Sequence, residues 1–427
     1  IATSLTGRSR GGPAKAAVVG SSLMGMISGT AVANVLTTGT ISIPLMKRAG
    51  YRPQVAGAIE AVASTGGQLM PPVMGAAAFL MADLTGVSYF EIARAAILPA
   101  LLYYVVLFAV VHLEALKRNI PIVETDSLPS LATTFLQGGH LLLSLPIFVY
   151  MLFAGYSVMY ASFWALIAAV CLSYVRPQTW LTPGKLLRTI ESGVEAILPV
   201  AAACATAGII IGVITLTGLG LKFSSLVISL SGGNLFLALL LTMAASLILG
   251  MGLPTAAAYI LVATLAAPAL EELGVNKLAA HLFVFYSAML SSITPPVALA
   301  AYAAAGLARA NPFQIAVVAC QFGVVAFIVP YFFAYSPALL GVNASLSTVL
   351  LAVLTSIIGA LCLAVAVQGW LFRKATIIER LGYGAIAWLM LDPNWKTDII
   401  GFSLLAALVA YQARFKKSEP IESSQET

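Results

Sequence analysis

Long apolar segments separated by short polar ones make up most of the chain. They cover 54–82, 92–116, 138–155, 157–174, 194–217, 276–306, 312–334, 346–368 and 397–413. Several approach or exceed the roughly 20 apolar residues that a helix needs to cross a bilayer. The pattern predicts an all-α polytopic membrane protein.

Two further apolar segments, 16–46 and 234–270, are interrupted near their middle. The interruptions read Ser28-Gly29-Thr30 and Gly252-Leu253-Pro254-Thr255. We expect each segment to be a helix–loop–helix hairpin that enters the membrane and leaves on the same side. Residues 371–391 are ambiguous, because four charged side chains leave only a short apolar remainder that fits a partial span.

The two interrupted segments are alike in sequence. SSLMGMISGTAVANV (21–35) aligns with SLILGMGLPTAAAYI (246–260) at an offset of 225. About forty residues later, GGQLMPPVMGAAAF (66–79) matches SSITPPVALAAYA (291–303) through a shared Pro-Pro-Val. A third match follows, between the FEIA and FQIA sequences that begin at Phe90 and Phe313. Three matches in one order indicate a duplication.

The duplication divides the chain into two repeats with connecting parts. A cytoplasmic start at 1–15, which looks like an interior cut, precedes the first repeat at 16–116. Connecting helices at 117–193 lead to the second repeat at 194–334, and C-terminal membrane helices at 346–413 end in a disordered cytoplasmic tail at 414–427. Hairpins 16–46 and 234–270 are each followed by a broken helix (54–82, 276–306) and a scaffold helix (92–116, 312–334), and helix 194–217 opens the second repeat.

The number of crossings between the hairpins sets their orientation. Five predicted spans separate them, and an odd number places the two hairpins on opposite sides of the membrane. Such inverted-topology repeats with broken helices are typical of secondary transporters. We therefore expect a secondary transporter.

Charge is scarce and unevenly distributed. Only 9% of residues are charged and 60% are apolar, whereas soluble domains carry about a quarter charged residues. If 371–396 returns the chain across the membrane, 18 of the 22 lysines and arginines fall on one face. Such an excess marks the cytoplasmic face. The formal charge of +6 is therefore a topology signal and does not indicate nucleic-acid binding.

The Pro-Pro pairs within spans suit an ion site. Proline removes backbone donors and frees carbonyls, which protein, water or an ion must satisfy in lipid. Gly66-Gly67 precede one pair, and Ser291, Ser292 and Thr294 precede the other, so carbonyls and hydroxyls are expected there at membrane depth. Sodium is the hard monovalent cation that this predicts. The alternative is a kink filled by neighbouring Ser or Thr.

The hairpin tips suit an anion. The second helix of each hairpin begins at the tip with unpaired N–H groups, and helix N-termini attract anions. Two tips near the midplane would hold a carboxylate beside sodium; the alternative for Ser28-Gly29-Thr30 is a helix packing contact. The candidate sodium and substrate-binding residues are Ser28, Gly29, Thr30, Asn34, Gly66, Gly67, Pro71, Gly252, Pro254, Thr255, Ser291, Ser292, Thr294 and Pro295.

Two acidic residues lie inside predicted spans. Glu60 and Glu195 are functional candidates by default, although either could reach the interface or pair with Arg52 or Arg188. An intramembrane enzyme is a remote alternative. Ser28 lacks the GxSG pattern, and no zinc motif, phosphate-binding loop or pair of catalytic carboxylates accompanies it. We expect no enzyme and no cofactor beyond sodium as the coupling ion.

Four segments resemble the large membrane subunit of tripartite ATP-independent periplasmic (TRAP) transporters. They are SGTAVANVLTTGTISIPLMKRAGY (28–51), GGQLMPPV (66–73), GMGLPTAAAYI (250–260) and SSITPPVALAAY (291–302). The resemblance covers roughly 15–340. Residues 346–413 look like the extra region of the fused type, in which small and large membrane subunits share one chain, so a small-subunit portion is expected upstream.

The resemblance implies an elevator-type transporter, with sodium-driven uptake of organic acids across the bacterial inner membrane. It also implies a periplasmic substrate-binding protein, of the TRAP-associated extracytoplasmic type in fused members. One sodium site would use 28–34 and 66–72, and the other 252–256 and 291–296. Several relatives carry an acidic residue where this chain has Gly252-Leu253, so backbone carbonyls would have to suffice there. A binding-protein-independent carrier with similar hairpins is the alternative.

Overall fold

The computed structural model describes residues 2–414 apart from 8, 123–134, 136–137, 343 and 392–394. The described residues form helices and no strand, which confirms the all-α prediction. The expected tail at 414–427 lies outside the described residues except for Arg414, as does most of the polar part of the 117–193 connection.

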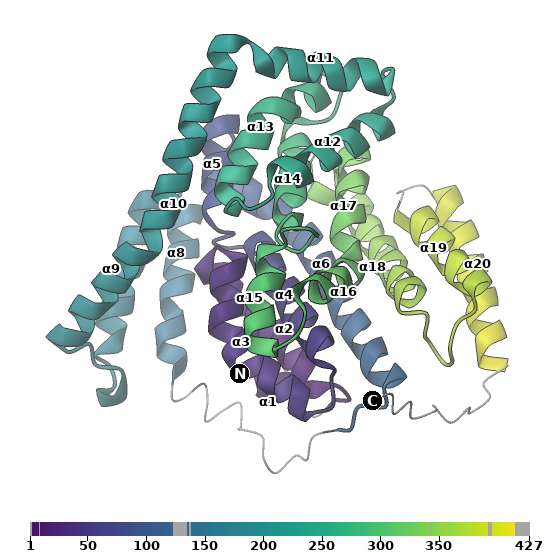
Figure 1. Ribbon diagram of the computed structural model, residues 1–427, viewed down its shortest axis with the longest axis horizontal. Coiled ribbons are helices and arrows are strands. Elements are labelled where there is room, and N and C mark those ends of the chain that lie inside the picture. The colour runs from purple at the N-terminus through teal and green to yellow at the C-terminus, as the bar shows by residue number, and fades with distance from the viewer. Residues whose placement is uncertain are drawn as a thin grey trace.

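The N-terminal part runs from α1 to α6, with α1 in the predicted start segment and the first repeat beginning within α2 (Figure 1). Its elements are α1 (Ala2–Thr6), α2 (Gly12–Ser28), α3 (Ala31–Arg48), α4 (Pro53–Gly66), the 3₁₀ turn η1 (Gly67–Leu69), α5 (Ala76–Thr85) and α6 (Tyr89–Lys117). Helices α2 and α3 form hairpin 1, and α4 and α5 are the two parts of broken helix 1. Proline, which suits the first turn, opens α4, and the Ser88 side chain caps α6.

The connecting part and the second repeat follow in the same manner. The connection holds η3 (Gly139–Leu143), α8 (Ser144–Phe153), α9 (Val158–Ser173) and η4 (Pro177–Thr179). Helix α10 (Pro183–Thr217) begins in the connection and includes the predicted helix 194–217 that opens the second repeat. The second repeat holds α11 (Leu219–Ser231), α12 (Leu235–Leu249), α13 (Thr255–Glu272), α14 (Lys277–Leu290), α15 (Leu299–Ala308), α16 (Pro312–Phe322) and α17 (Val324–Tyr335). Helices α12 and α13 form hairpin 2, and α14 and α15 are the two parts of broken helix 2. Side-chain caps from Asn234, Asn276 and Asn311 fix three of these helix starts.

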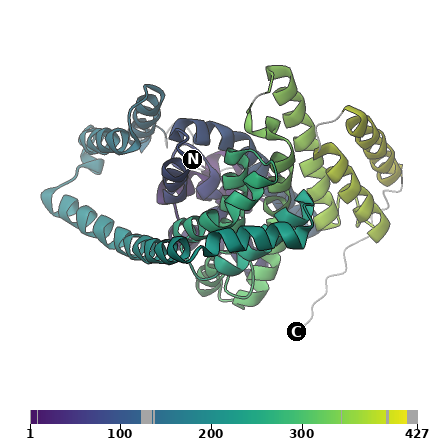
Figure 2. The same ribbon diagram turned by 90° about the horizontal axis from the view of Figure 1, so that it is seen from above.

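The C-terminal part packs on the outside of this core. A short 3₁₀ turn, η5 (Pro337–Leu340), leads to α18 (Leu346–Gln368), α19 (Ile377–Leu391) and α20 (Trp395–Arg414). Helix α18 packs against α6 and α19, and α19 packs against α20. Seen from above, α8–α10 and α18–α20 extend from opposite sides of the central helices (Figure 2).

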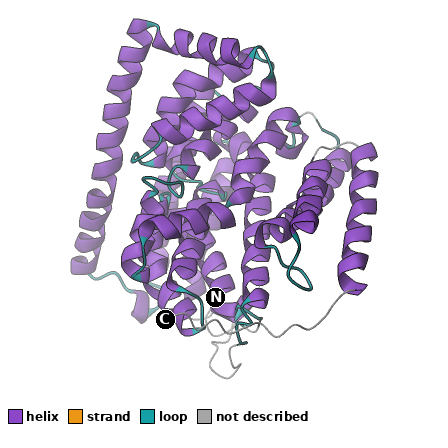
Figure 3. Cartoon of the chain, turned by 45° about the vertical axis from the view of Figure 1, so that its right-hand side comes forward, coloured by secondary structure: helices purple, strands orange, loops and turns teal. Residues whose placement is uncertain are grey.

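The second part of each broken helix packs against the opposite repeat. Helix α15 lies against α3 and α4, and α5 lies against α13 and α14. Hairpin 1 and α15 occupy the lower part of Figure 1, whereas hairpin 2 and α5 occupy the upper part, and Figure 3 shows loops between these two parts. The packing between the repeats is therefore reciprocal, and the inverted orientation of the repeats in the membrane stays a prediction.

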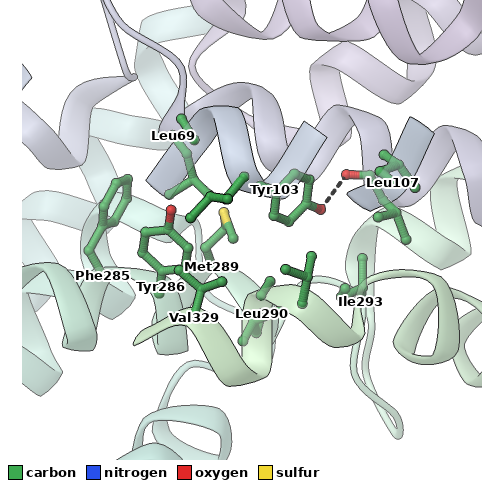
Figure 4. Packing of buried hydrophobic residues seen from close by; sticks show 14 of the residues in the cluster. Leu69, Tyr103, Leu107, Phe285, Tyr286, Met289, Leu290, Ile293 and Val329 are labelled. Atoms are coloured by element: carbon green, nitrogen blue, oxygen red, sulfur yellow. Dashed lines mark hydrogen bonds between the residues drawn. The ribbon is translucent and has the colours of Figure 1, made fainter. Parts of the chain in front are cut away.

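Apolar side chains of both repeats fill the region where the repeats meet. Leu69 and Tyr103 from the first repeat lie beside Tyr286, Met289 and Val329 from the second (Figure 4). All five are buried, with at most 2% of their surface exposed. The two halves therefore share one apolar core.

Three described helices are long and apolar enough to cross a membrane: α6, α10 and α18. Helices α16 and α17 would make a fourth if they count as one span, although they are bent by 42° at Gly323. The sequence predicted one scaffold helix at 312–334, with no bend indicated. A Cβ on Gly323 would lie only 3.0 Å from the Ile293 side chain, so glycine at the bend allows close packing on broken helix 2.

The structure also contains a helix that the sequence did not indicate. Helix α11 follows α10 directly at Gly218, whose φ of 66° turns the chain, and it crosses the top of the molecule in Figure 1. It packs against α13 and α12. Its apolar residues are too few for a span, so hydropathy alone gave no signal for it.

Candidate functional site

The tip of hairpin 1 is a turn of two residues. Helix α2 ends at Ser28, Gly29 adopts a left-handed conformation with φ of 66°, and Thr30 is the extended residue that precedes α3. The Thr30 hydroxyl does not cap α3. The Ser28 Oγ is buried and finds no hydrogen-bond partner among the described residues. The fold therefore uses neither the Ser28 hydroxyl in a hydrogen bond nor the Thr30 hydroxyl as a cap of α3.

The tip lies directly on the break in broken helix 1. A Cβ added to Gly25 would stand 2.5 Å from the Cα of Gly67, and one added to Gly29 would stand 2.9 Å from the Cα of Gly75. Such contacts are possible only between glycines, since real Cβ atoms do not approach so closely. The structure thus places Gly25 against Gly67 and Gly29 against Gly75, so that hairpin 1 lies along the break from its start to its end.

Asn34 fastens the hairpin and the broken helix together. It is fully buried, and its Nδ2 donates to the carbonyl of Ser21 at 2.8 Å and lies 3.4 Å from the carbonyl of Ser64. The side chain therefore joins both arms of hairpin 1 to the end of α4. Its observed contacts are structural ones, behind the tip.

Side chains supply donors to several carbonyls near the break. The Tyr103 and Tyr104 hydroxyls donate to the carbonyls of Val62 and Ala63 at 2.7 and 2.8 Å. The Tyr89 hydroxyl lies 2.6 Å from the carbonyls of both Pro72 and Val73. Sequence reasoning missed these tyrosines, because they come from α6. No side-chain donor reaches a carbonyl of the stretch 66–71 among the described residues.

Hairpin 2 has a longer tip. Helix α12 ends at Leu249 and α13 begins at Thr255. Between them Gly252 has a φ of 76°, a conformation that side chains disfavour. This accounts for glycine at a position where the resemblance led us to look for an acidic residue. Thr255 is buried, and Pro254 precedes it as the extended residue at the helix start.

The tip of hairpin 2 also lies on its own break. The Ser291 Oγ is 3.0 Å from the carbonyl of Gly250 and 2.6 Å from that of Ala288. Ser292 is buried beside it and accepts from the N–H of Ala300 at 2.9 Å through its carbonyl. The Thr294 hydroxyl instead bonds back to its own helix, at the Leu290 carbonyl.

The two tip-on-break contacts are equivalent. Gly25 and Gly250 are 225 positions apart, and Gly67 and Ser291 are 224 apart, the offsets of the sequence repeat. The following segments correspond as well. Each holds a cis Pro-Pro bond, at Pro71-Pro72 and Pro295-Pro296, and each ends on a residue with positive φ, Met74 or Ala298.

The two hairpins pack with different neighbours. Hairpin 1 packs on α4, η1, α6 and α15, and hairpin 2 packs on α10, α11, α14 and α5. A carboxylate held between both tips therefore remains a prediction. A surface pocket of about 430 Å³ lies elsewhere, at the start of α14 and beside η5, lined by Asn276, Ser336 and Ser345 among others.

The two acidic candidates have different surroundings. Glu195 is exposed on α10. Glu60 is fully buried on α4, where hydroxyl groups surround its carboxylate, and neither acid forms an ion pair with Arg52 or Arg188 in the described residues. In the sequence, the signal for the Glu60 site is a carboxyl group inside an apolar segment, with Ser64 one helical turn further along the chain.

The chain combines many apolar helices with two interrupted hairpins and two broken helices. This combination defines a polytopic membrane protein of the secondary-transporter class. The chain belongs to the family of the DctM component of tripartite ATP-independent periplasmic transporters, whose model matches residues 1–372. This confirms the resemblance seen in the sequence. It also confirms a multi-pass protein of the bacterial inner membrane that is a transporter component and not an enzyme.

Individual relatives match parts of the chain. The C4-dicarboxylate TRAP transporter large permease protein DctM of Pseudomonas aeruginosa is 36% identical over 30% of this chain and 30% of its own length. The sialic acid TRAP transporter permease protein SiaT of Haemophilus influenzae is 23% identical over 78% of this chain and 53% of its own. A Salmonella typhimurium protein named YgiK is 31% identical over 33% of this chain. The matches thus span about half or less of each of these relatives, 35% in YgiK.

Proposed function

We propose that the chain is the transport core of a sodium-coupled permease that imports an organic acid delivered by a periplasmic binding protein. This proposal rests on a contact that is repeated at equivalent positions in both halves. Each hairpin tip lies against the break in the broken helix of the same repeat. It gives each half one place where helix ends, carbonyls and hydroxyls converge. Unwound segments of this kind coordinate sodium in secondary transporters.

The first half offers the oxygen ligands that a hard cation prefers. The Ser28 Oγ has no partner among the described residues, the Thr30 hydroxyl is not used as a helix cap, and carbonyls within 66–71 lack side-chain donors. The second half offers Thr255 and the carbonyls around Ser292. These groups are uncharged, which suits a monovalent ion that must also leave.

The substrate class follows from the helix starts and from the relatives. The first N–H groups of α3 and α13, at Ala31 and Thr255, have no partner within their own helices and favour an anion. The names of two relatives mention C4-dicarboxylates and sialic acid, and both of these compounds carry carboxylates. We infer an organic acid, with a binding protein and a small membrane subunit as partners.

Reconstitution tests this function. The complete permease in liposomes, supplied with a carboxylate-loaded periplasmic binding protein, is expected to take up substrate only when an inward sodium gradient is imposed. Uptake that proceeds equally without sodium would refute the coupling. Uptake by the permease alone would instead support the binding-protein-independent carrier. Sodium-dependent thermal stabilisation across a panel of organic acids would then identify the substrate.

A further inference from the structure

A fully buried carboxylate lies at the base of hairpin 1. Glu60 on α4 has no exposed surface, and four hydroxyls surround it. The Oγ of Ser21 and the Oγ1 of Thr38 lie 2.6 and 2.5 Å from its Oε1, and the Oγ of Ser64 lies 3.0 Å away. Ser42 bonds to the other carboxylate oxygen, Oε2. The four donors come from α2, α3 and α4.

No cation neutralises this carboxylate in the described part of the chain. The ion pairs there join other residues. The charged and titratable side chains on α2, α3, α15, α16 and the middle of α6 are Lys15, Lys47, Arg48, Tyr302, Cys320, Tyr103 and Tyr104, and Arg309 directly follows α15. Lys15 donates to Ser9 at 3.0 Å and Lys47 to the Ala308 carbonyl at 2.8 Å, while Tyr104 donates to Ala63.

The second repeat shows that the fold does not need this group. At the offsets of the repeat, Glu60 corresponds to Val284. Thr38, Ser42 and Ser64 correspond to three alanines, at 263, 267 and 288. The same interface between hairpin and broken helix therefore packs with apolar side chains in hairpin 2, where all four residues are buried. Packing alone does not explain a carboxyl and three additional hydroxyls in hairpin 1.

The spacing of the oxygens selects the ligand. Metal ions sit at about 2.0–2.6 Å from each of several oxygens and hold those oxygens apart. Here the Ser21 and Thr38 oxygens lie 2.6 and 2.5 Å from the carboxylate oxygen, which is hydrogen-bond distance and closer than two oxygens that share one metal ion, so the arrangement favours a proton over a metal ion. Ser and Thr hydroxyls rotate and both donate and accept. The four hydroxyls of Ser21, Thr38, Ser42 and Ser64, which we call the hydroxyl cage, can therefore form hydrogen bonds with either an ionised or a protonated Glu60.

We propose that Glu60 is a proton-binding site whose occupancy is linked to the position of hairpin 1. A proton from water binds one carboxylate oxygen and neutralises the buried charge. The Thr38 hydroxyl then accepts from the protonated carboxyl and donates its own hydrogen to the Asn34 carbonyl, which lies 2.8 Å away. No covalent bond other than that of the added proton changes. Because three cage hydroxyls belong to the hairpin, protonation alters how firmly α2 and α3 are held on α4.

Infrared difference spectroscopy on the complete purified protein tests proton binding directly. Between acidic and alkaline pH, wild type is expected to lose the C=O stretching band of a protonated carboxyl, and Glu60→Gln is expected to lack that change. Glu114→Gln is the matched control, because Glu114 is buried too but is paired with Arg118. A band unaffected by Glu60→Gln would overturn the proposal, and so would a band that follows sodium concentration at constant pH.

A second variant covers the case in which Glu60→Gln does not fold. Combining Glu60→Val with Thr38→Ala, Ser42→Ala and Ser64→Ala copies the residues that the second repeat has at the equivalent positions of hairpin 2 and α14. This variant is expected to fold and to lack the band; a folded variant that retains the band refutes the assignment.

The transport arm of the test rests on the proposed function. Uptake by wild type is expected to vary with pH at a fixed sodium gradient, and Glu60→Gln is expected to flatten that dependence. If wild type and every variant lack uptake while wild type still shows the infrared change, the proposed function fails and the proton site stands. An unchanged pH profile in folded Glu60→Gln overturns the link to the hairpin.

Discussion

The hydroxyls at the two hairpin tips are free of the tasks that threonine usually has at a helix start. Thr30 stands at the N-cap position of α3, where a threonine side chain ordinarily accepts from the third N–H, yet it makes no such bond. Thr255 is the first residue of α13, with Pro254 at the cap position. At the residue scale, this leaves both hydroxyls available to a ligand.

We expect Thr30→Val and Thr255→Val each to raise the sodium concentration needed for half-maximal uptake. Loss of one hydroxyl ligand costs ~1 kcal/mol, or roughly fivefold in sodium affinity. Sodium titrations of uptake measure this. Thr37→Val is the control, since Thr37 is exposed and bonds to its own helix at Ala33. Wild-type sodium dependence in both variants would remove these residues from the site.

Close backbone contact holds each hairpin on its broken helix. In the first half Gly25 and Gly67 touch through their Cα atoms, and Tyr103 leaves no space for a side chain at Gly66. In the second half Ser291 replaces one glycine and adds a hydrogen bond to the Gly250 carbonyl. At the element scale, the tips are positioned by contacts that tolerate no added atom.

A single methyl group at this contact is therefore expected to be destabilising. Gly25→Ala places a Cβ 2.5 Å from Gly67, and overpacking of this kind costs about 1–3 kcal/mol. Thermal unfolding of the purified protein measures the loss. Gly20→Ala on the same helix is the control, because its Cβ would meet only Ala2 at 3.8 Å, and it should be neutral or slightly stabilising. Equal stability of both variants would contradict the packing argument.

The whole molecule is held together by a reciprocal exchange between repeats. Helix α5 of the first repeat lies on hairpin 2, and α15 of the second lies on hairpin 1. Each exchanged helix ends on a lysine from the other repeat. Lys277 donates to the Thr85 carbonyl at 2.7 Å, and Lys47 donates to the Ala308 carbonyl at 2.8 Å. Basic groups at helix C-termini satisfy such carbonyls and oppose the helix dipole.

Removing these two caps should weaken both halves independently. Lys47→Met and Lys277→Met are each expected to cost about 1–2 kcal/mol, and their effects should add within roughly 0.5 kcal/mol because they lie at separate ends of the core. Thermal unfolding of the single and double variants measures this. Lys222→Met, at an exposed position on α11, is the control. A double variant no less stable than either single one would argue against two separate caps.

Much of the fold was predictable because its signals are local. Apolar length indicated the long helices, and small residues marked the tip at which α2 ends and α3 begins. Pro-Pro pairs marked both breaks. The bend at Gly323 and helix α11 were missed, since a glycine within an apolar run and a short amphipathic helix leave no distinct hydropathy pattern.

By itself, the sequence determined the class of protein, the order of its helices and the duplication, since these depend on neighbouring residues and on a repeat that one alignment exposes. Only the tertiary structure decided which atoms meet. Tyr103 reaches Val62 across 41 positions, and Lys47 reaches Ala308 across 261. The hydroxyl cage around Glu60 likewise forms from three helices. Contacts between distant residues depend on how whole helices pack, which no local pattern encodes.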